Sequence, residues 1–135
     1  MKIIVQCYLV SGVAFLALDA VWLGIMGSAL YRPQLGSLLL DKFLIAPAIA
    51  FYLLYPIGIA VFAVAPALQA VSATTALGYG LLLGFLAYAT YDLTNLATLR
   101  GWSPLVTCLD MGWGAIASGI AAVAGYGAIR LLEKA

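Results

Sequence analysis

Long apolar stretches, separated by short polar breaks, make up most of the chain. Crossing a bilayer as a helix takes ~20 consecutive apolar residues. Four stretches are long enough, at roughly residues 3–30, 43–65, 75–99 and 105–132. Because the breaks between them are short, neighbouring helices must run in opposite directions. The pattern predicts an all-α polytopic membrane protein, an antiparallel four-transmembrane-helix bundle in which residues 1–135 form a single transmembrane domain.

The first stretch also has a feature of secretory signal peptides, since Lys2 precedes an apolar run. The apolar core of a signal peptide is only ~7–15 residues long. The run in this chain continues to Leu30. We therefore expect a retained, tilted first helix.

The composition favours lipid as the solvent. Hydrophobic residues make up 66% of the chain and charged residues 8%, whereas soluble domains carry about 25% charged residues. The net charge of +1 gives no basic surface for nucleic acid. The lipid bilayer is therefore the expected partner, and nucleic acid is not.

The absence of histidine narrows the chemistry, because the only thiols are those of Cys7 and Cys108. The usual zinc sites and histidine-held haem are excluded, as are nucleophiles activated by histidine. We expect neither a metal nor a cofactor. We also expect Cys7 and Cys108 to lie near opposite membrane faces, too far apart for a disulfide.

Charge does not decide the orientation. Lys2, Arg130 and Lys134 belong to the face that holds the N-terminus, here called side A. Arg32, Lys42 and Arg100 belong to the opposite face, side B. The positive-inside rule weighs Lys and Arg in short loops, and here it gives a tie.

Three aspartates, Asp19, Asp92 and Asp110, interrupt the apolar stretches. Each costs at least ~2.5–3.5 kcal/mol at the bilayer centre. At ~1.5 Å of rise per residue, Asp110 lies ~8 Å, Asp92 ~10 Å and Asp19 ~16 Å below side B. We therefore expect them to converge in the side-B half, although they come from three different helices.

Further polar and aromatic residues accompany these aspartates. In the third stretch, Tyr88, Tyr91 and Asn95 form a stripe at helical spacing, with Asp92 on its flank, and such a face turns away from lipid. The first and fourth stretches each carry Leu-Asp-x-x-Trp, in which an indole N–H three residues on can donate to the local carboxylate. The candidate ligand-binding or proton site therefore comprises Asp19, Trp22, Tyr88, Tyr91, Asp92, Asn95, Asp110 and Trp113.

Small residues recur at four-residue spacing in the last two stretches, as in Gly80/Gly84 and Gly114/Ser118. This spacing lets helix backbones approach closely in a membrane. We favour packing inside one bundle, and a homodimer seam is the alternative.

Residues 87–97, Ala-Tyr-Ala-Thr-Tyr-Asp-Leu-Thr-Asn-Leu-Ala, and the Leu-Asp-x-x-Trp-Gly segment at 109–114 resemble a bacterial family of small predicted four-helix inner-membrane proteins of unknown function. The segments at 18–22 and 51–55 are similar to it as well. The resemblance implies the four-helix fold and a multi-pass location in the bacterial inner (plasma) membrane. It implies no activity.

Three functions remain open on these observations. The first is proton- or cation-linked binding or transport of a small or lipid-like ligand, because ionisable residues inside membranes mark such sites. The second is a membrane-embedded lipid-modifying enzyme, with Asp92 or Asp110 as general base or with the acids holding Mg²⁺ against a diphosphate. The third is an accessory or structural membrane subunit, in which the polar groups only hold the register of the bundle.

Overall fold

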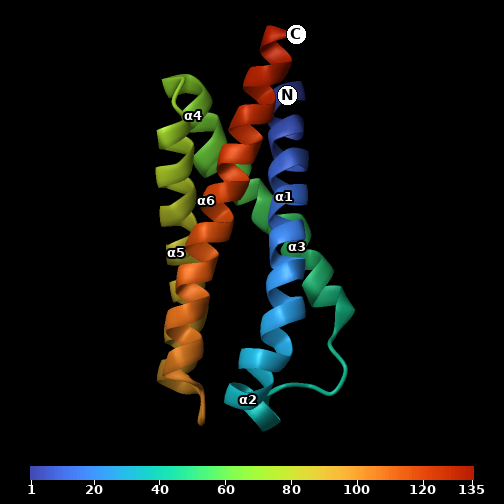
Figure 1. Cartoon of the computed structure of the whole chain (residues 1–135), viewed down its shortest axis with the longest axis vertical. Helices are drawn as coiled ribbons and strands as arrows, with labels where there is room; N and C mark the ends of the chain where they lie inside the picture. The colour runs from blue at the N-terminus through green and yellow to red at the C-terminus, as the bar shows by residue number, and fades with distance from the viewer.

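The computed structural model describes residues 1–135 and contains only helices and their connections. Four helical segments are long and apolar enough to cross a membrane, and they pack together as the sequence predicted. They are Lys2–Leu38, Ile45–Ala70, Ala73–Thr98 and Pro104–Lys134. Both chain termini lie at one end of the bundle, side A (Figure 1).

The first two segments are built from several helical elements each. The first consists of α1 (Lys2–Met26), the π-helix η1 (Gly27–Tyr31), α2 (Arg32–Leu35) and the 3₁₀-helix η2 (Gly36–Leu38). The second consists of α3 (Ile45–Gly58), the π-helix η3 (Ile59–Val64) and α4 (Ala65–Ala70). The other two are single helices, α5 (Ala73–Thr98) and α6 (Pro104–Lys134).

The first segment extends beyond the predicted end near residue 30. The chain continues through η1 into α2, where Pro33 lies in the first turn. Gly36, with a φ of 48°, then ends α2. This extension places Tyr31 and Arg32 on helical backbone next to the bundle rather than in a loop.

Side-chain caps start the last two helices where the sequence turns polar. The Ser72 Oγ accepts a hydrogen bond from the Thr75 amide at 3.1 Å, and the Ser103 Oγ accepts one from the Val106 amide at 3.2 Å. Each cap satisfies an amide that the first turn of a helix leaves free. Pro104 follows directly at the first position of α6.

Helices α5 and α6 approach most closely through their small residues. A Cβ added at Gly84 would overlap the carbonyl of Gly114, and one at Gly80 would lie 2.8 Å from the Gly119 Cα. The predicted packing of these residues inside one bundle is therefore confirmed. Because α6 already occupies the face of α5 that holds Gly80 and Gly84, these two residues are not exposed to a second copy of the chain.

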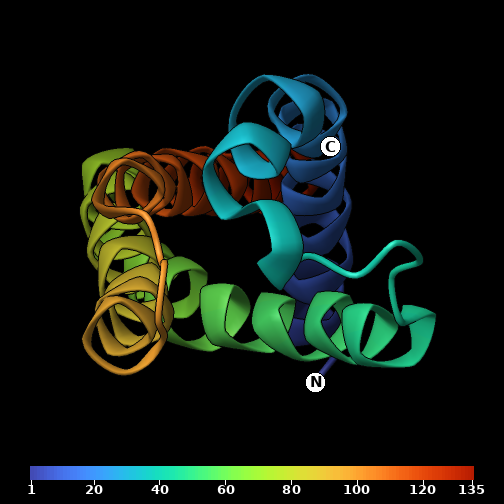
Figure 2. The same cartoon turned by 90° about the horizontal axis from the view of Figure 1, so that it is seen from below.

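The two halves of the bundle differ in how closely their helices pack. Towards side A, η3 packs against α1, α5 and α6 around buried residues such as Val64, Ala117 and Ala121. Towards side B, α3 has almost no contact with α5. Figure 2, seen from side B, shows the start of α3 and the end of α5 at separate corners. We call the side-B half the splayed half.

Candidate functional site

The three aspartates are all buried. The exposed fraction is 6% for Asp19 of α1, 0% for Asp92 of α5 and 5% for Asp110 of α6. None of them forms an ion pair, since the one salt bridge of the chain joins Arg130 to Glu133. The carboxylates are therefore supported only by neutral groups and by one another.

Asp19 receives two hydrogen bonds from neighbouring segments. The Trp113 indole Nε1 of α6 donates to Oδ1 at 3.0 Å, and the Tyr52 hydroxyl of α3 donates to Oδ2. Asp19 thus ties α1 to both α3 and α6. Because neutral donors stabilise a carboxylate without cancelling its charge, an ionised Asp19 leaves a net negative charge in the bundle.

Asp110 is reached through a two-step chain of hydrogen bonds. The Tyr31 hydroxyl of η1 donates to its Oδ1, and the Trp22 indole Nε1 of α1 donates to the Tyr31 oxygen at 2.8 Å. Tyr31 is the last residue of the π-helical turn η1. Such wider turns, in which one extra residue is inserted, often occur at functional sites.

The expectation that each Leu-Asp-x-x-Trp segment pairs its own Asp and Trp is wrong. Trp113 donates to Asp19, and Trp22 donates to Tyr31 rather than to a carboxylate of its own segment. The two indole rings stack on each other, with centroids 4.5 Å apart and planes 6° apart. Stacking covers part of each ring between α1 and α6, where both side chains are half-buried, and from there each N–H reaches across the interface.

Asp92 is fully buried, and neither of its oxygens has a hydrogen-bond donor. Its side chain adjoins that of Asp110. Two ionised carboxylates are both acceptors, so this contact includes a hydrogen bond only when one of them carries a proton. A proton held by either acid would supply the hydrogen bond that neither Asp92 oxygen receives from the rest of the bundle.

Asp92 also lies at the centre of the inward face of α5, where the sequence pattern placed Tyr91. The buried residues of this helix are Ala76, Gly80, Gly84 and Asp92. Their four-residue spacing follows the ridge that packs against α6. The row of residues that contains Gly80, Gly84 and Asp92 packs against α6. Tyr91 belongs to the neighbouring row, so it lies at the edge of the inward face and is 54% exposed.

A cavity of about 710 Å³ occupies the splayed half. Its polar lining comes mainly from Asp19, Asp110 and the tyrosines, and its apolar lining from the start of α3 and the segment before it. The residues that line it are Asp19, Leu23, Gly24, Gly27, Ser28, Tyr31, Arg32, Leu35, Leu39, Phe43, Leu44, Ala48, Tyr52, Tyr88, Tyr91, Trp102, Asp110 and Trp113.

Five of the predicted site residues line this cavity and three do not. The lining residues are Asp19, Tyr88, Tyr91, Asp110 and Trp113. Trp22 and Asp92 lie behind the wall and reach it through Tyr31 and Asp110. Asn95 is half-buried beside Tyr91 and does not line the cavity.

Sequence reasoning missed three of the polar lining residues, Tyr31, Arg32 and Tyr52. Arg32 directly precedes Pro33, which indicated a turn, and the π-helical turn that contains Tyr31 has no sequence signature. Tyr52 carried a signal that could have been used. It lies three residues before Tyr55, and both rings contact Phe15 of α1, so α3 turns an aromatic face inward.

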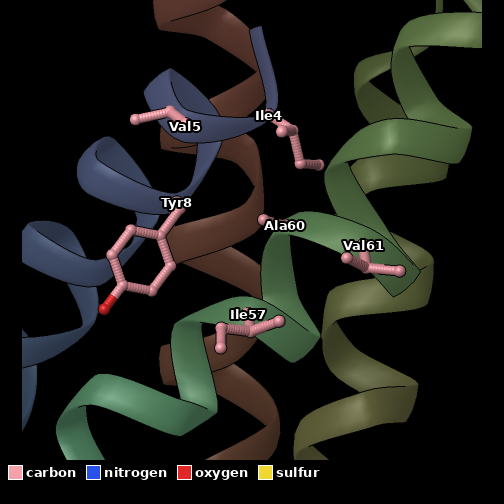
Figure 3. Close-up of a pocket in the computed structure, with 6 residues that line it drawn as sticks. All are labelled: Ile4, Val5, Tyr8, Ile57, Ala60 and Val61. Atoms are coloured by element: carbon pink, nitrogen blue, oxygen red, sulfur yellow. The ribbon is translucent and has the colours of Figure 1, made fainter. Parts of the chain in front are cut away.

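A second pocket, of about 170 Å³, lies between α1 and the second segment (Figure 3). Its lining residues are all hydrophobic. The Tyr8 hydroxyl points away from it and donates to the carbonyl oxygen of Leu53 at 3.0 Å. This pocket has no polar group with which to orient a ligand.

The carboxylates do not form a set of ligands for Mg²⁺. No three acidic or cysteine side chains are grouped closely enough to hold a metal ion. The cysteines are also separate, Cys7 buried and Cys108 exposed, and both are unpaired, as predicted. The Mg²⁺ form of the enzyme hypothesis therefore has no support from the geometry.

The chain belongs to a family described as Predicted membrane protein (DUF2177), whose profile matches residues 4–127. This agrees with the expectation of an uncharacterised membrane family with four apolar helices. No curated protein and no solved structure matches the chain.

Proposed function

We propose that this member of the predicted membrane protein family binds a small or lipid-like ligand in the cavity of the splayed half, and that binding or transport is linked to a proton or cation at Asp19, Asp92 and Asp110. The observation that carries the proposal is a cavity of about 710 Å³ bordered by two buried carboxylates. Ligand pockets typically enclose about 300–1,000 Å³ and combine an apolar lining with a few polar groups. The bacterial inner membrane is the location we propose.

The Asp92–Asp110 pair supports the proton part of the proposal. A proton held between them can leave when a positive charge enters the cavity, since Asp110 borders it and Asp92 lies behind Asp110. Tyr31 donates to Asp110 and lines the same cavity, so a ligand that displaces its hydroxyl also changes the surroundings of the pair.

A purely structural role explains Asp92 less well. Polar contacts between membrane helices contribute about 0.6 kcal/mol each on average. The carboxylate of Asp92 receives no such contact from a donor. It therefore adds nothing to the register of the bundle that could offset the cost of burying it.

A lipid-modifying enzyme is the second candidate for the same cavity. Tyr88 lines the cavity, and its hydroxyl bonds to no protein group, so it is free to bind a substrate near Asp110, the candidate base. Binding without turnover supports the first proposal, whereas chemical change of a bound lipid supports the second.

The test measures thermal unfolding of the purified protein in lipid nanodiscs, with neutral, anionic and cationic single-chain amphiphiles at several pH values. We expect at least one class to raise the unfolding temperature of the wild type to an extent that depends on pH. Asp92→Asn should keep the fold and lose that dependence. Glu133→Gln, the same chemical change at side A, should behave like wild type.

Two results would contradict the proposal. One is the absence of stabilisation by any of the amphiphiles at any pH. The other is an Asp92→Asn protein that keeps the pH dependence of the wild type.

A further inference from the structure

We infer that the cavity takes an amphiphile with an ammonium-type head group, held with its positive charge towards Asp19 and Asp110 and its hydrocarbon chain towards the gap between α3 and α5. This inference rests on the proposed function and names its ligand class.

The first support is an imbalance of charge. Asp19 and Asp110 border the cavity and Asp92 lies directly behind it, with no cation paired to any of them. An ionised carboxylate away from water needs a partner charge or a proton. The hydrogen bonds from Tyr52, Trp113 and Tyr31 come from neutral donors, so the site retains its negative charge when the carboxylates ionise.

The second support is the aromatic lining. Besides the carboxylates, the cavity is bordered by Tyr31, Tyr52, Tyr88, Tyr91, Trp102 and Trp113. Aromatic faces attract ammonium groups, and rings together with carboxylates form the usual surroundings of a bound organic cation. Three of these rings are held in place by hydrogen bonds to carboxylates, Tyr52 and Trp113 to Asp19 and Tyr31 to Asp110.

The size and lining of the cavity favour an organic cation over an inorganic one. A space of about 710 Å³, in which 12 of 18 lining residues are hydrophobic, far exceeds what a single ion fills. The acids also form no group that could coordinate a metal. An apolar body must therefore accompany the charge.

The path of that apolar body follows from the splaying of the helices. Leu35, Leu39, Phe43, Leu44 and Ala48 belong to the apolar part of the lining. Phe43 is 70% and Leu44 66% exposed. They lie directly before α3, whose start stands away from the end of α5 (Figure 2). A hydrocarbon chain along these residues leads into the bilayer.

Arg32 suggests the opposite ligand and provides the sharpest alternative. It is the one basic residue of the lining, and it is exposed on α2 at side B. An anionic head group would bind there, at the water end of the cavity, and would leave the buried carboxylates without a partner. We therefore place the cationic head at the carboxylates and treat binding at Arg32 as the outcome that overturns the inference.

The test compares three probes with the same chain, decyltrimethylammonium, decyl sulfonate and decanol. The two ionic probes are charged at every pH used. Binding to the full chain in nanodiscs of an uncharged glycolipid is measured by calorimetry, and the signal of empty nanodiscs is subtracted. We expect the ammonium probe to bind roughly tenfold or more tightly than the sulfonate, since a desolvated ammonium–aromatic contact alone supplies that ratio.

Asp19→Asn should reduce the preference for the ammonium probe to roughly twofold or less, because it removes a charge that borders the cavity. If Asp19→Asn does not fold, as judged by the absence of a cooperative unfolding transition, Asp110→Asn is measured in its place. Glu133→Gln, far from the cavity at side A, should keep the preference.

Nanodiscs that contain phosphatidylethanolamine distinguish the two sources of an ammonium head group. Weaker probe binding in them assigns the site to an ammonium phospholipid of the bilayer, and unchanged binding assigns it to a free amphiphile. Both results keep the ligand class.

The inference is overturned if decyl sulfonate binds as tightly as the ammonium probe or more tightly, or if Asp19→Asn and Asp110→Asn both fold and keep the preference. Loss of sulfonate binding in Arg32→Gln would then assign the site to anions. In that case pH-linked binding still supports the proposed function, whereas binding of none of the three probes at any pH contradicts both.

Discussion

The two halves of the bundle use the same helices in opposite ways. Towards side A, the small residues of α6 meet α1, α5 and η3 at close range, and the buried side chains there are mostly apolar. Towards side B, α3 leaves α5, and the buried side chains include three carboxylates beside a cavity. Close packing thus holds one end of a thin bundle together, while the other end contains the cavity.

This difference shows how a short membrane protein can keep carboxylates inside lipid. Lipid provides no hydrophobic drive between helices, so packing has to supply the association. The closed half does this through backbone approach, as at Gly80 and Gly84. The splayed half can then carry groups that cost stability, such as Asp92 without a donor.

The largest expected effect comes from filling the closest contact in the bundle. Gly84→Ala adds a Cβ that overlaps the Gly114 backbone, and we expect a loss of about 1–3 kcal/mol or more. Gly78→Ala on the same helix meets nothing within 4 Å, and it should stabilise the helix by up to about 1 kcal/mol. Thermal unfolding in nanodiscs compares the two. Equal stability of both variants would contradict the close packing of α5 and α6.

A second prediction tests the crossed hydrogen bonds of the splayed half. Trp113→Phe keeps an aromatic ring stacked on Trp22 but removes the N–H that donates to Asp19. A buried acceptor that loses a donor costs about 1–3 kcal/mol. Asp19→Ala, which removes the acceptor, should cost less in the Trp113→Phe background than in the wild type, because the two residues share one hydrogen bond. Strict additivity in this double-mutant cycle would show that the bond contributes nothing.

A third prediction concerns the unpartnered carboxylate. Asp92→Asn keeps the shape of the side chain and removes a charge that no donor stabilises. We expect stability equal to that of the wild type within about 1 kcal/mol, or higher. Infrared spectra should lose a carboxylic acid band that the wild type shows from the Asp92–Asp110 pair. An unchanged band would show that the pair holds no proton.

The smallest effect is expected at the exposed ion pair. Arg130 donates to Glu133 at 2.7 Å, with side chains 36% and 43% exposed. Exposed pairs contribute about 0–1 kcal/mol. Arg130→Gln should therefore change the unfolding temperature less than the other variants do. It also leaves side A with fewer Lys and Arg residues than side B. Reporter fusions at the C-terminus would show whether that change moves side B to the cytoplasm.

The sequence by itself determined the class of fold and the depth of the carboxylates. Apolar length selects membrane helices, because a backbone in lipid must satisfy its own hydrogen bonds. The steady rise of a helix then sets how deep each residue lies, so Asp19, Asp92 and Asp110 could be assigned to the side-B half before any contact was known. The glycine spacing of α5 likewise indicated where two backbones approach.

Only the tertiary structure decided which groups meet. The indoles of Trp22 and Trp113 cross between helices because stacking places their N–H groups beyond their own segments. Tyr31 and Tyr52 join the carboxylates through a π-helical turn and an oblique helix. The cavity exists because α3 separates from α5. Hydropathy and spacing describe one helix at a time, whereas each of these features depends on the angle and rotation of one helix relative to another.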